Sequence, residues 1–151
     1  MKKYWLLKSE PTCYSIDDLA KDKETLWTGV RNYQARNFMR DDMKVGDLVL
    51  FYHSSTLVPA VVGIAEISGP SLPDVTALDK KDDHYDPKIT KEKNVWYAAQ
   101  VKFKKKLKNP VTLNQIKFNP KLDGIILAAT GSRLSVQPVS ETHYKEIIKL
   151  D

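Results

Sequence analysis

The sequence predicts an α+β fold in a single domain, residues 1–151, with five or six strands in a bent, mixed sheet or small barrel surrounded by short helices. A chain of 151 residues with 42% hydrophobic and 28% charged residues suits one ordinary globular domain. Its strand-like runs do not alternate regularly with helices, as they would in a parallel sheet. The chain shows no internal repeat, low-complexity tract or interdomain linker.

The first elements are a strand and a short helix. Lys3–Lys8 predicts a partly buried strand, which Pro11 closes because proline lacks an amide donor. A helix is expected over Ser15–Ala20, with the serine as its cap. Asp17 and Asp18 lie in its first turn, where the helix dipole favours anions.

A second helix is expected after the loop Trp27–Val30. Asn32 is a suitable cap, and the helix should continue through Met43 because apolar residues recur three or four positions apart. Val45–Asp47 marks the turn out of this helix.

Two strands, Asp47–His53 and Ala60–Ser68, are rich in Val, Ile and aromatic residues and predict a hairpin with a longer loop. The following segment, Gly69–Asn94, is charged and lacks periodicity. A loop of about 25 residues is uncommon in a compact domain and is often functional.

The last third returns to regular structure. The expected elements are a strand over Val95–Leu107, a short helix over Thr112–Lys117, an ambiguous segment Ile125–Ala128, a strand over Leu134–Gln137 and a helix from Ser140 through Leu150. The lysines at 104–106 fit either a solvated strand end or a ridge that contacts phosphates.

Composition limits the possible functions. A net charge of +5 favours a polyanion partner, since neutralising phosphates releases counterions. The single cysteine and three histidines lack the spacing of a metal site, so neither metal nor cofactor is expected. No segment is apolar enough to span a membrane. We expect a monomer in the cytoplasm, or in the nucleus of a eukaryote.

Catalysis is the less favoured alternative. No Gly-rich phosphate loop or nucleophile elbow is present. His53 beside Ser54 suggests a general base acting on a nucleotide or modified nucleobase. Asp47, however, lies six residues away on the same strand, roughly 20 Å at the rise of a strand, too far to orient the imidazole.

Several motifs occur in order along the chain. They are Trp5–Pro11, Trp27–Asn37, Gly46–Ser54, Gly63–Ile67, Tyr85–Pro87 and Arg133–Val139. Together, over Lys3–Leu150, they resemble the EVE domain family of the PUA-like superfamily, related to YTH and ASCH domains. The resemblance implies a PUA-like fold and a reader of modified bases. Methylated or hydroxymethylated cytosine is the leading candidate, and DNA is favoured over RNA as the partner.

A base reader needs rings for the base faces and short polar groups for its edge. Trp27 and Tyr52 are the expected walls, with Tyr52 preferred over Phe51 because its tip is polar. The other expected base contacts are Ser9, Asn32, Tyr33, His53, Ser54, Tyr85 and Ser135. Arg31, Arg36 and Arg133 are the expected phosphate contacts.

Structural roles compete with these assignments. Trp27 also suits a core position, Asn32 a helix cap and Arg36 a solvated helix face. An adaptor that binds RNA or an acidic protein through charge alone is a third hypothesis, distinguished by strong salt dependence without base preference.

Overall fold

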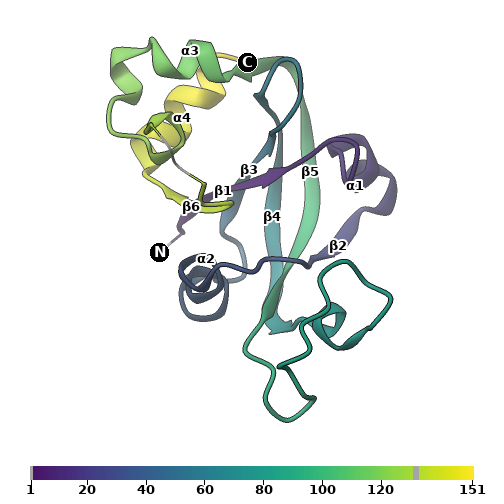
Figure 1. Cartoon of the computed structure of the whole chain (residues 1–151). Helices are drawn as coiled ribbons and strands as arrows, with labels where there is room; N and C mark the ends of the chain where they lie inside the picture. The colour runs from purple at the N-terminus through teal and green to yellow at the C-terminus, as the bar shows by residue number, and fades with distance from the viewer. Residues whose placement is uncertain (1, 131–132) are drawn as a thin grey trace.

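The computed structural model describes residues 2–130 and 133–151, which form one six-stranded sheet with helices around it (Figure 1). The strands are β1 (Tyr4–Ser9), β2 (Glu24–Trp27), β3 (Leu48–His53), β4 (Ala60–Pro73), β5 (Tyr97–Thr112) and β6 (Val136–Val139). The α-helices are α1 (Ile16–Asp22), α2 (Tyr33–Asn37), α3 (Leu113–Lys117) and α4 (Glu141–Lys149).

The sheet is mixed, with the strand order β2-β5-β4-β3-β1-β6. β1 pairs with β3 in parallel, and the other pairs are antiparallel. The long strands β4 and β5 curve through the middle of the molecule (Figure 1), and their register shifts at four places between Val61 and Leu72. Such irregularities bend a strand and increase its twist. The predicted α+β class with a bent mixed sheet is therefore confirmed.

Each face of the sheet carries its own apolar core. Along β1, Trp5 and Leu7 face the core that includes residues of α1 and α2, whereas Leu6 faces the core that includes residues of α3 and α4. On β3, Phe51 belongs to the first core and Tyr52 to the second. The alternation follows from the two-residue period of a strand, and it decides which aromatic residues share a cavity.

The helix starts agree with their expected caps. The Ser15 hydroxyl accepts a hydrogen bond from the amide of Asp18, whose carboxylate accepts one from the Ser15 amide, so α1 begins with a capping box. Asn32 caps α2 through the amide of Ala35, and Ser140 caps α4. The expected helix through Met43 is divided, because residues Phe38–Asp42 form a π-helical turn after α2.

Other boundaries differ from the sequence expectation. β2 was not predicted, since its four residues lack an apolar alternation. β4 extends to Pro73 and β5 begins at Tyr97, so the loop between them is shorter than expected. β6 begins at Val136, two residues later than predicted. The ambiguous segment contains a 3₁₀ turn, Ile126–Ala128, and the other short 3₁₀ turns are Val75–Leu78 and Pro120–Leu122.

Among the helices formed by the described residues, none is both long and apolar enough to cross a membrane. Over the same residues, no cluster of three or more His, Cys, Asp and Glu side chains is placed to hold a metal ion.

Candidate functional site

A cleft of about 430 Å³ opens where the end of β1, the edge strand β2 and the loop between β4 and β5 meet. Its volume lies within the roughly 300–1,000 Å³ typical of small-molecule sites. Its lining residues are Lys8, Ser9, Glu10, Cys13, Tyr14, Thr25, Leu26, Trp27, Thr28 and His84. The cleft therefore combines two predicted residues, Ser9 and Trp27, with residues that the sequence did not single out.

Trp27 lies at the end of β2, paired with Ala99 of β5, and only 8% of its surface is exposed. Its ring is nearly perpendicular to those of Phe51 and Tyr14, with centroids 5.4 Å and 6.3 Å away. Edge-to-face packing of this kind fixes an aromatic ring. Trp27 is therefore both a core residue and part of the cleft wall, so the two interpretations of it are compatible.

Ser9 and Tyr14 form a polar side of the cleft. The Ser9 hydroxyl donates a hydrogen bond of 2.6 Å to the Tyr14 carbonyl, which leaves the lone pairs of Ser9 as acceptors. The Tyr14 hydroxyl donates one of 2.8 Å to Asp22. Burial and the hydrogen bond to Asp22 raise the pKa of Tyr14 to about 12. Beside them, burial lowers the pKa of Lys8.

His84 reaches the cleft from the loop between β4 and β5 and packs against Gly29. A Cβ at Gly29 would lie 2.6, 2.7 and 2.9 Å from Nε2, Cε1 and Cδ2 of His84. These three distances are nearly equal, so the face of the imidazole, and not its edge, rests on the glycine. Gly29 also has a φ of +85°, which favours glycine.

The buried carboxylate of Asp74 ties this loop to the segment after β2. It accepts hydrogen bonds from the amide of Gly29 at 2.8 Å and from the guanidinium of Arg31 at 3.0 Å. Arg31 in turn donates two hydrogen bonds to the carbonyl of His84. Burial alone raises the pKa of Asp74, but the hydrogen bonds from Thr76, Gly29 and Arg31 outweigh it and hold the pKa below its usual value.

A stack of rings and guanidinium groups supports the same junction. Arg31 lies 5.3 Å from the ring centroid of Trp96, Trp96 stacks on Tyr33 at 4.9 Å, and Arg36 lies 5.0 Å from the Tyr33 centroid. The indole of Trp96 also donates a hydrogen bond to Asp86. Tyr33 is 60% exposed, yet its ring already stacks on Trp96 and carries a guanidinium, so it is not a free stacking surface.

The prediction that Tyr52 walls the cavity is wrong. Tyr52 is 3% exposed and packs with the core on the opposite face of the sheet, where burial raises its pKa to about 12. Its neighbour Phe51 is the residue that meets Trp27. Strand alternation placed the two rings on opposite faces as expected, but the polarity of the tyrosine did not indicate which face holds the cleft.

His53 and Ser54 have structural contacts outside the cleft lining. The Nε2 atom of His53 accepts a hydrogen bond of 3.1 Å from the amide of Ile16, at the start of α1. The lone pair that a general base would use is therefore engaged, and burial lowers the pKa of this imidazole. The amide of Ser54 donates to the carbonyl of Ser9, which continues the pairing of β1 and β3.

The remaining predicted base contacts lie at or beyond the rim. The side chain of Asn32 caps α2, which is the structural role that competed with base contact. Tyr85 is half-buried and does not line the cleft; the loop presents His84 there. The carbonyl of Ser135 accepts a hydrogen bond from the amide of Lys8, which brings Ser135 next to a cleft residue without making it part of the lining.

Two of the three predicted phosphate contacts are engaged inside the protein. Arg31 binds Asp74 and the His84 carbonyl, whereas Arg36 donates to the carbonyl of Val95 and to Asn37. Arg133 is exposed. The lysine run on β5 faces acidic partners: Lys104 lies near Glu66, Lys105 near Asp151 and Lys106 near Asp17. These exposed ion pairs reduce its positive potential but are individually weak.

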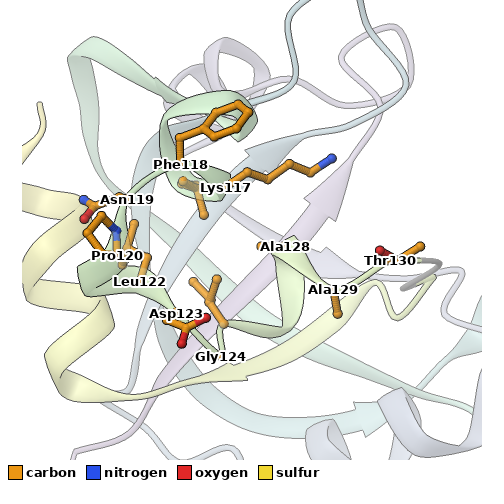
Figure 2. A pocket seen from close by; sticks show the side chains of 12 residues that line it. Lys117, Phe118, Asn119, Pro120, Leu122, Asp123, Gly124, Ala128, Ala129 and Thr130 are labelled. Atoms are coloured by element: carbon orange, nitrogen blue, oxygen red, sulfur yellow. The ribbon is translucent and has the colours of Figure 1, made fainter.

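A second, wider cleft of about 780 Å³ lies at the α3 end of the molecule. Figure 2 shows Lys117 and Phe118 on one side of it and Ala128–Thr130 on the other. Phe118 is 84% exposed. None of the predicted base or phosphate contacts is among the described residues that line this cleft, and Phe118 is the aromatic residue among them.

Comparison with known proteins identifies the family of this chain. The family model described as EVE domain matches residues 3–150. Thymocyte nuclear protein 1 of Gallus gallus is 38% identical over 166 residues, covering 98% of this chain and 68% of that protein. A solved structure of a hypothetical protein from Leishmania major is 51% identical, with a TM-score of 0.95, covering 99% of this chain and 94% of that one.

Two further structures carry nucleic acid. A crystal structure of human THYN1 protein in complex with DNA containing 5-methylcytosine is 33% identical, with a TM-score of 0.92, covering 99% of this chain and 97% of that one. The YTH domain of Zygosaccharomyces rouxii MRB1 protein, in complex with N6-methyladenosine RNA, is 18% identical and has a TM-score of 0.56. At that identity the likeness shows a shared fold alone.

Proposed function

Because this chain belongs to the EVE domain family, we propose that it is a non-catalytic module that binds DNA and holds one modified base in the cleft beside Trp27. The base class that we propose is methylated or hydroxymethylated cytosine. Support comes from the THYN1 relative, whose crystal structure contains 5-methylcytosine DNA.

The observation that carries the proposal is the convergence of Trp27, Ser9 and His84 on one cleft. A base requires a flat apolar surface for its face and fixed polar atoms for its edge. Trp27 and Tyr14 supply aromatic surface, while the Ser9 hydroxyl and the His84 imidazole supply polar atoms. The walls are held by packing and hydrogen bonds, which lowers the entropy cost of binding.

The energetics favour a flipped base only when several contacts act together. Extruding a base from a duplex costs a few kcal/mol, and stacking on an aromatic ring returns roughly 1–3 kcal/mol. Hydrogen bonds to the base edge and phosphate contacts, favoured by the net charge of +5, must supply the remainder.

Catalysis by His53 receives no support from the geometry, because its Nε2 atom caps α1 through Ile16. Binding of RNA or of an acidic protein by charge alone would need no cleft. Binding to single-stranded RNA distinguishes that adaptor role from the base reader.

The test is a titration series at fixed salt with duplexes that carry cytosine, 5-methylcytosine, 5-hydroxymethylcytosine or N6-methyladenine at one position. We expect the tightest binding to a modified cytosine and a loss of about tenfold in Trp27→Phe, since a smaller ring stacks less well. Trp5→Phe is the matched control: Trp5 is a buried tryptophan whose indole donates to Asp47 and which does not line the cleft.

Equal affinity for all four duplexes would contradict the reader function. If Trp5→Phe and Trp27→Phe weaken DNA binding equally, the loss of affinity comes from general destabilisation of the protein. Equal binding to single-stranded RNA of the same length, with the same salt dependence, would favour the adaptor instead.

A further inference from the structure

We propose that His84 is the residue that selects a base with an exocyclic amino group, so that the cleft accepts methylated cytosine and rejects thymine. This inference rests on the proposed function, since it assigns the selectivity of the same cleft. Cytosine with a 5-methyl group and thymine have the same C5 substituent and differ in the hydrogen-bonding groups of the pyrimidine edge.

His84 is held through both its ring and its backbone. Its Nδ1 atom lies 3.1 Å from a carboxylate oxygen of Asp82, which also accepts the His84 amide at 2.8 Å. Its carbonyl accepts two hydrogen bonds from Arg31, at 2.8 and 3.2 Å. Its face rests on Gly29. A side chain held in this way is suited to selecting between ligands of nearly equal shape.

The contact with Asp82 sets the hydrogen-bonding character of the other ring nitrogen. An ionised carboxylate only accepts hydrogen bonds, so Nδ1 keeps its proton and donates a hydrogen bond to Asp82. In the neutral imidazole, Nε2 is then an acceptor. Among residues 2–130 and 133–151 no group donates a hydrogen bond to Nε2 of His84. Because Gly29 packs on the ring face, the in-plane lone pair of Nε2 remains available.

An acceptor at this place distinguishes amino from keto bases. The N4 amino group of cytosine is a donor and satisfies Nε2, whereas the O4 atom of thymine is an acceptor and leaves both atoms unpaired. A base bound in the cleft displaces water from Nε2, so leaving this acceptor unpaired in the complex is costly. The same contact predicts that unmodified cytosine is preferred over uracil.

Glu10 is the competing acceptor, because it is an exposed carboxylate that also lines the cleft. Carboxylates accept from the cytosine amino group in other complexes. The carboxylate of Glu10, however, is held less firmly than His84, since it accepts a weak hydrogen bond of 3.6 Å from the Cys13 thiol. His84 is therefore the stronger assignment, and Glu10→Gln is the matched control.

The experiment separates the amino group from the methyl group. Four duplexes carry cytosine, 5-methylcytosine, uracil or thymine at one position, each opposite an abasic site so that base pairing does not bias extrusion. Affinities are measured for all variants at the same pH, about 8. The comparison of cytosine with 5-methylcytosine tests the proposed function, and the comparison of each cytosine with its keto partner tests His84.

We expect the wild-type protein to bind each amino base about tenfold or more tightly than its keto partner. His84→Ala and His84→Phe should bind amino and keto bases within about twofold, while Glu10→Gln keeps the wild-type preference. His84→Phe preserves a flat ring over Gly29, and thermal unfolding of each variant confirms that it is folded.

Three outcomes overturn the inference. The first is an amino preference that survives in both His84 variants, the second is a preference lost only in Glu10→Gln, and the third is a wild-type protein without any amino preference. If the amino preference depends on His84 but 5-methylcytosine and cytosine bind equally, the inference stands and the proposed reading of modification fails. If none of the four duplexes binds, both fail.

Discussion

The imidazole of His84 rests directly on the backbone of Gly29, in a space that has no room for a Cβ atom. The two residues are far apart in the sequence and are brought together by Asp74, which binds the amide of Gly29, and by Arg31, which binds both Asp74 and the His84 carbonyl. Of these residues only His84 lines the cleft, and the others hold it in place. The cleft should therefore be sensitive to substitutions that do not touch the ligand.

Gly29→Ala should abolish tight DNA binding, because the new Cβ would lie 2.6 Å from Nε2 of His84 and displace the ring. The matched control is Gly46→Ala: Gly46 also has a positive φ, +95°, but nothing lies within 4 Å of its Cβ position. Both variants should lose about 1 kcal/mol or more of unfolding free energy from backbone strain. Fluorescence titration should show loss of affinity in Gly29→Ala alone; equal affinities in the two variants would contradict the packing argument.

Arg31→Lys should loosen the loop between β4 and β5 although it conserves charge. A lysine ammonium cannot reproduce the fork that reaches Asp74, Thr76 and the His84 carbonyl together. We expect the free energy of unfolding, measured in urea, to fall by about 1–3 kcal/mol, and the amides of that loop to exchange faster. Arg40→Lys is the control, because the pair of Arg40 with Asp41 is exposed and should change stability by less than about 0.5 kcal/mol.

Tyr52→Phe should leave DNA affinity unchanged, because Tyr52 packs on the face of the sheet opposite the cleft. Tyr14→Ala should weaken binding by about tenfold through lost aromatic surface. The measurement is the same titration with a modified duplex. A clear loss of affinity in Tyr52→Phe, with an unchanged unfolding midpoint, would show that the opposite face also contacts the ligand.

Stability should decline as the pH falls below about 6.5, and His53 should be the cause. Burial lowers the pKa of folded His53 below the ordinary value of 6.5, so the unfolded chain takes up the proton first. The stabilising contribution is therefore present above 6.5 and is lost as the pH falls through the folded pKa. Protonation of Nε2 also removes the acceptor for the Ile16 amide.

The measurement is the urea unfolding midpoint between about pH 7.5 and pH 5. His53→Gln retains an acceptor and does not titrate, so its midpoint should vary less over this range. The carboxylates whose pKa values are lowered from 3.8, such as Asp74 and Asp86, lose their contribution mainly below about pH 5, outside this range. If the unfolding midpoint changes with pH equally in the wild-type protein and in His53→Gln, the assignment to His53 is contradicted.

Local patterns in the sequence predicted much of this fold. Apolar runs located β1, β3 and β4, and the helix caps at Ser15, Asn32 and Ser140 were correct because a capping hydrogen bond involves only neighbouring residues. β2 was missed because its four residues are held by pairing with β5, and pairing partners are not visible in a local pattern.

The predicted base contacts overlap only in part with the lining of the candidate cleft. Ser9 and Trp27 are predicted base contacts that line the cleft. In the long loop the sequence pointed to Tyr85, whereas its neighbour His84 is the residue that lines the cleft. The available signal for His84 was Asp82, two residues before it, since an Asp side chain in a loop commonly binds the amide two residues on. That signal indicates a turn and does not show where the turn packs.

By itself, the sequence determined the fold class, the strand periodicity, the capped helix starts and the family motifs, because each depends on residues close together in the chain. The tertiary structure decided which face of β3 adjoins the cleft and therefore excluded Tyr52. It also decided that His53 and Arg31 serve internal contacts and that His84 reaches Gly29. These outcomes depend on contacts between distant segments, chiefly those of the buried Asp74, whose partners no local pattern specifies.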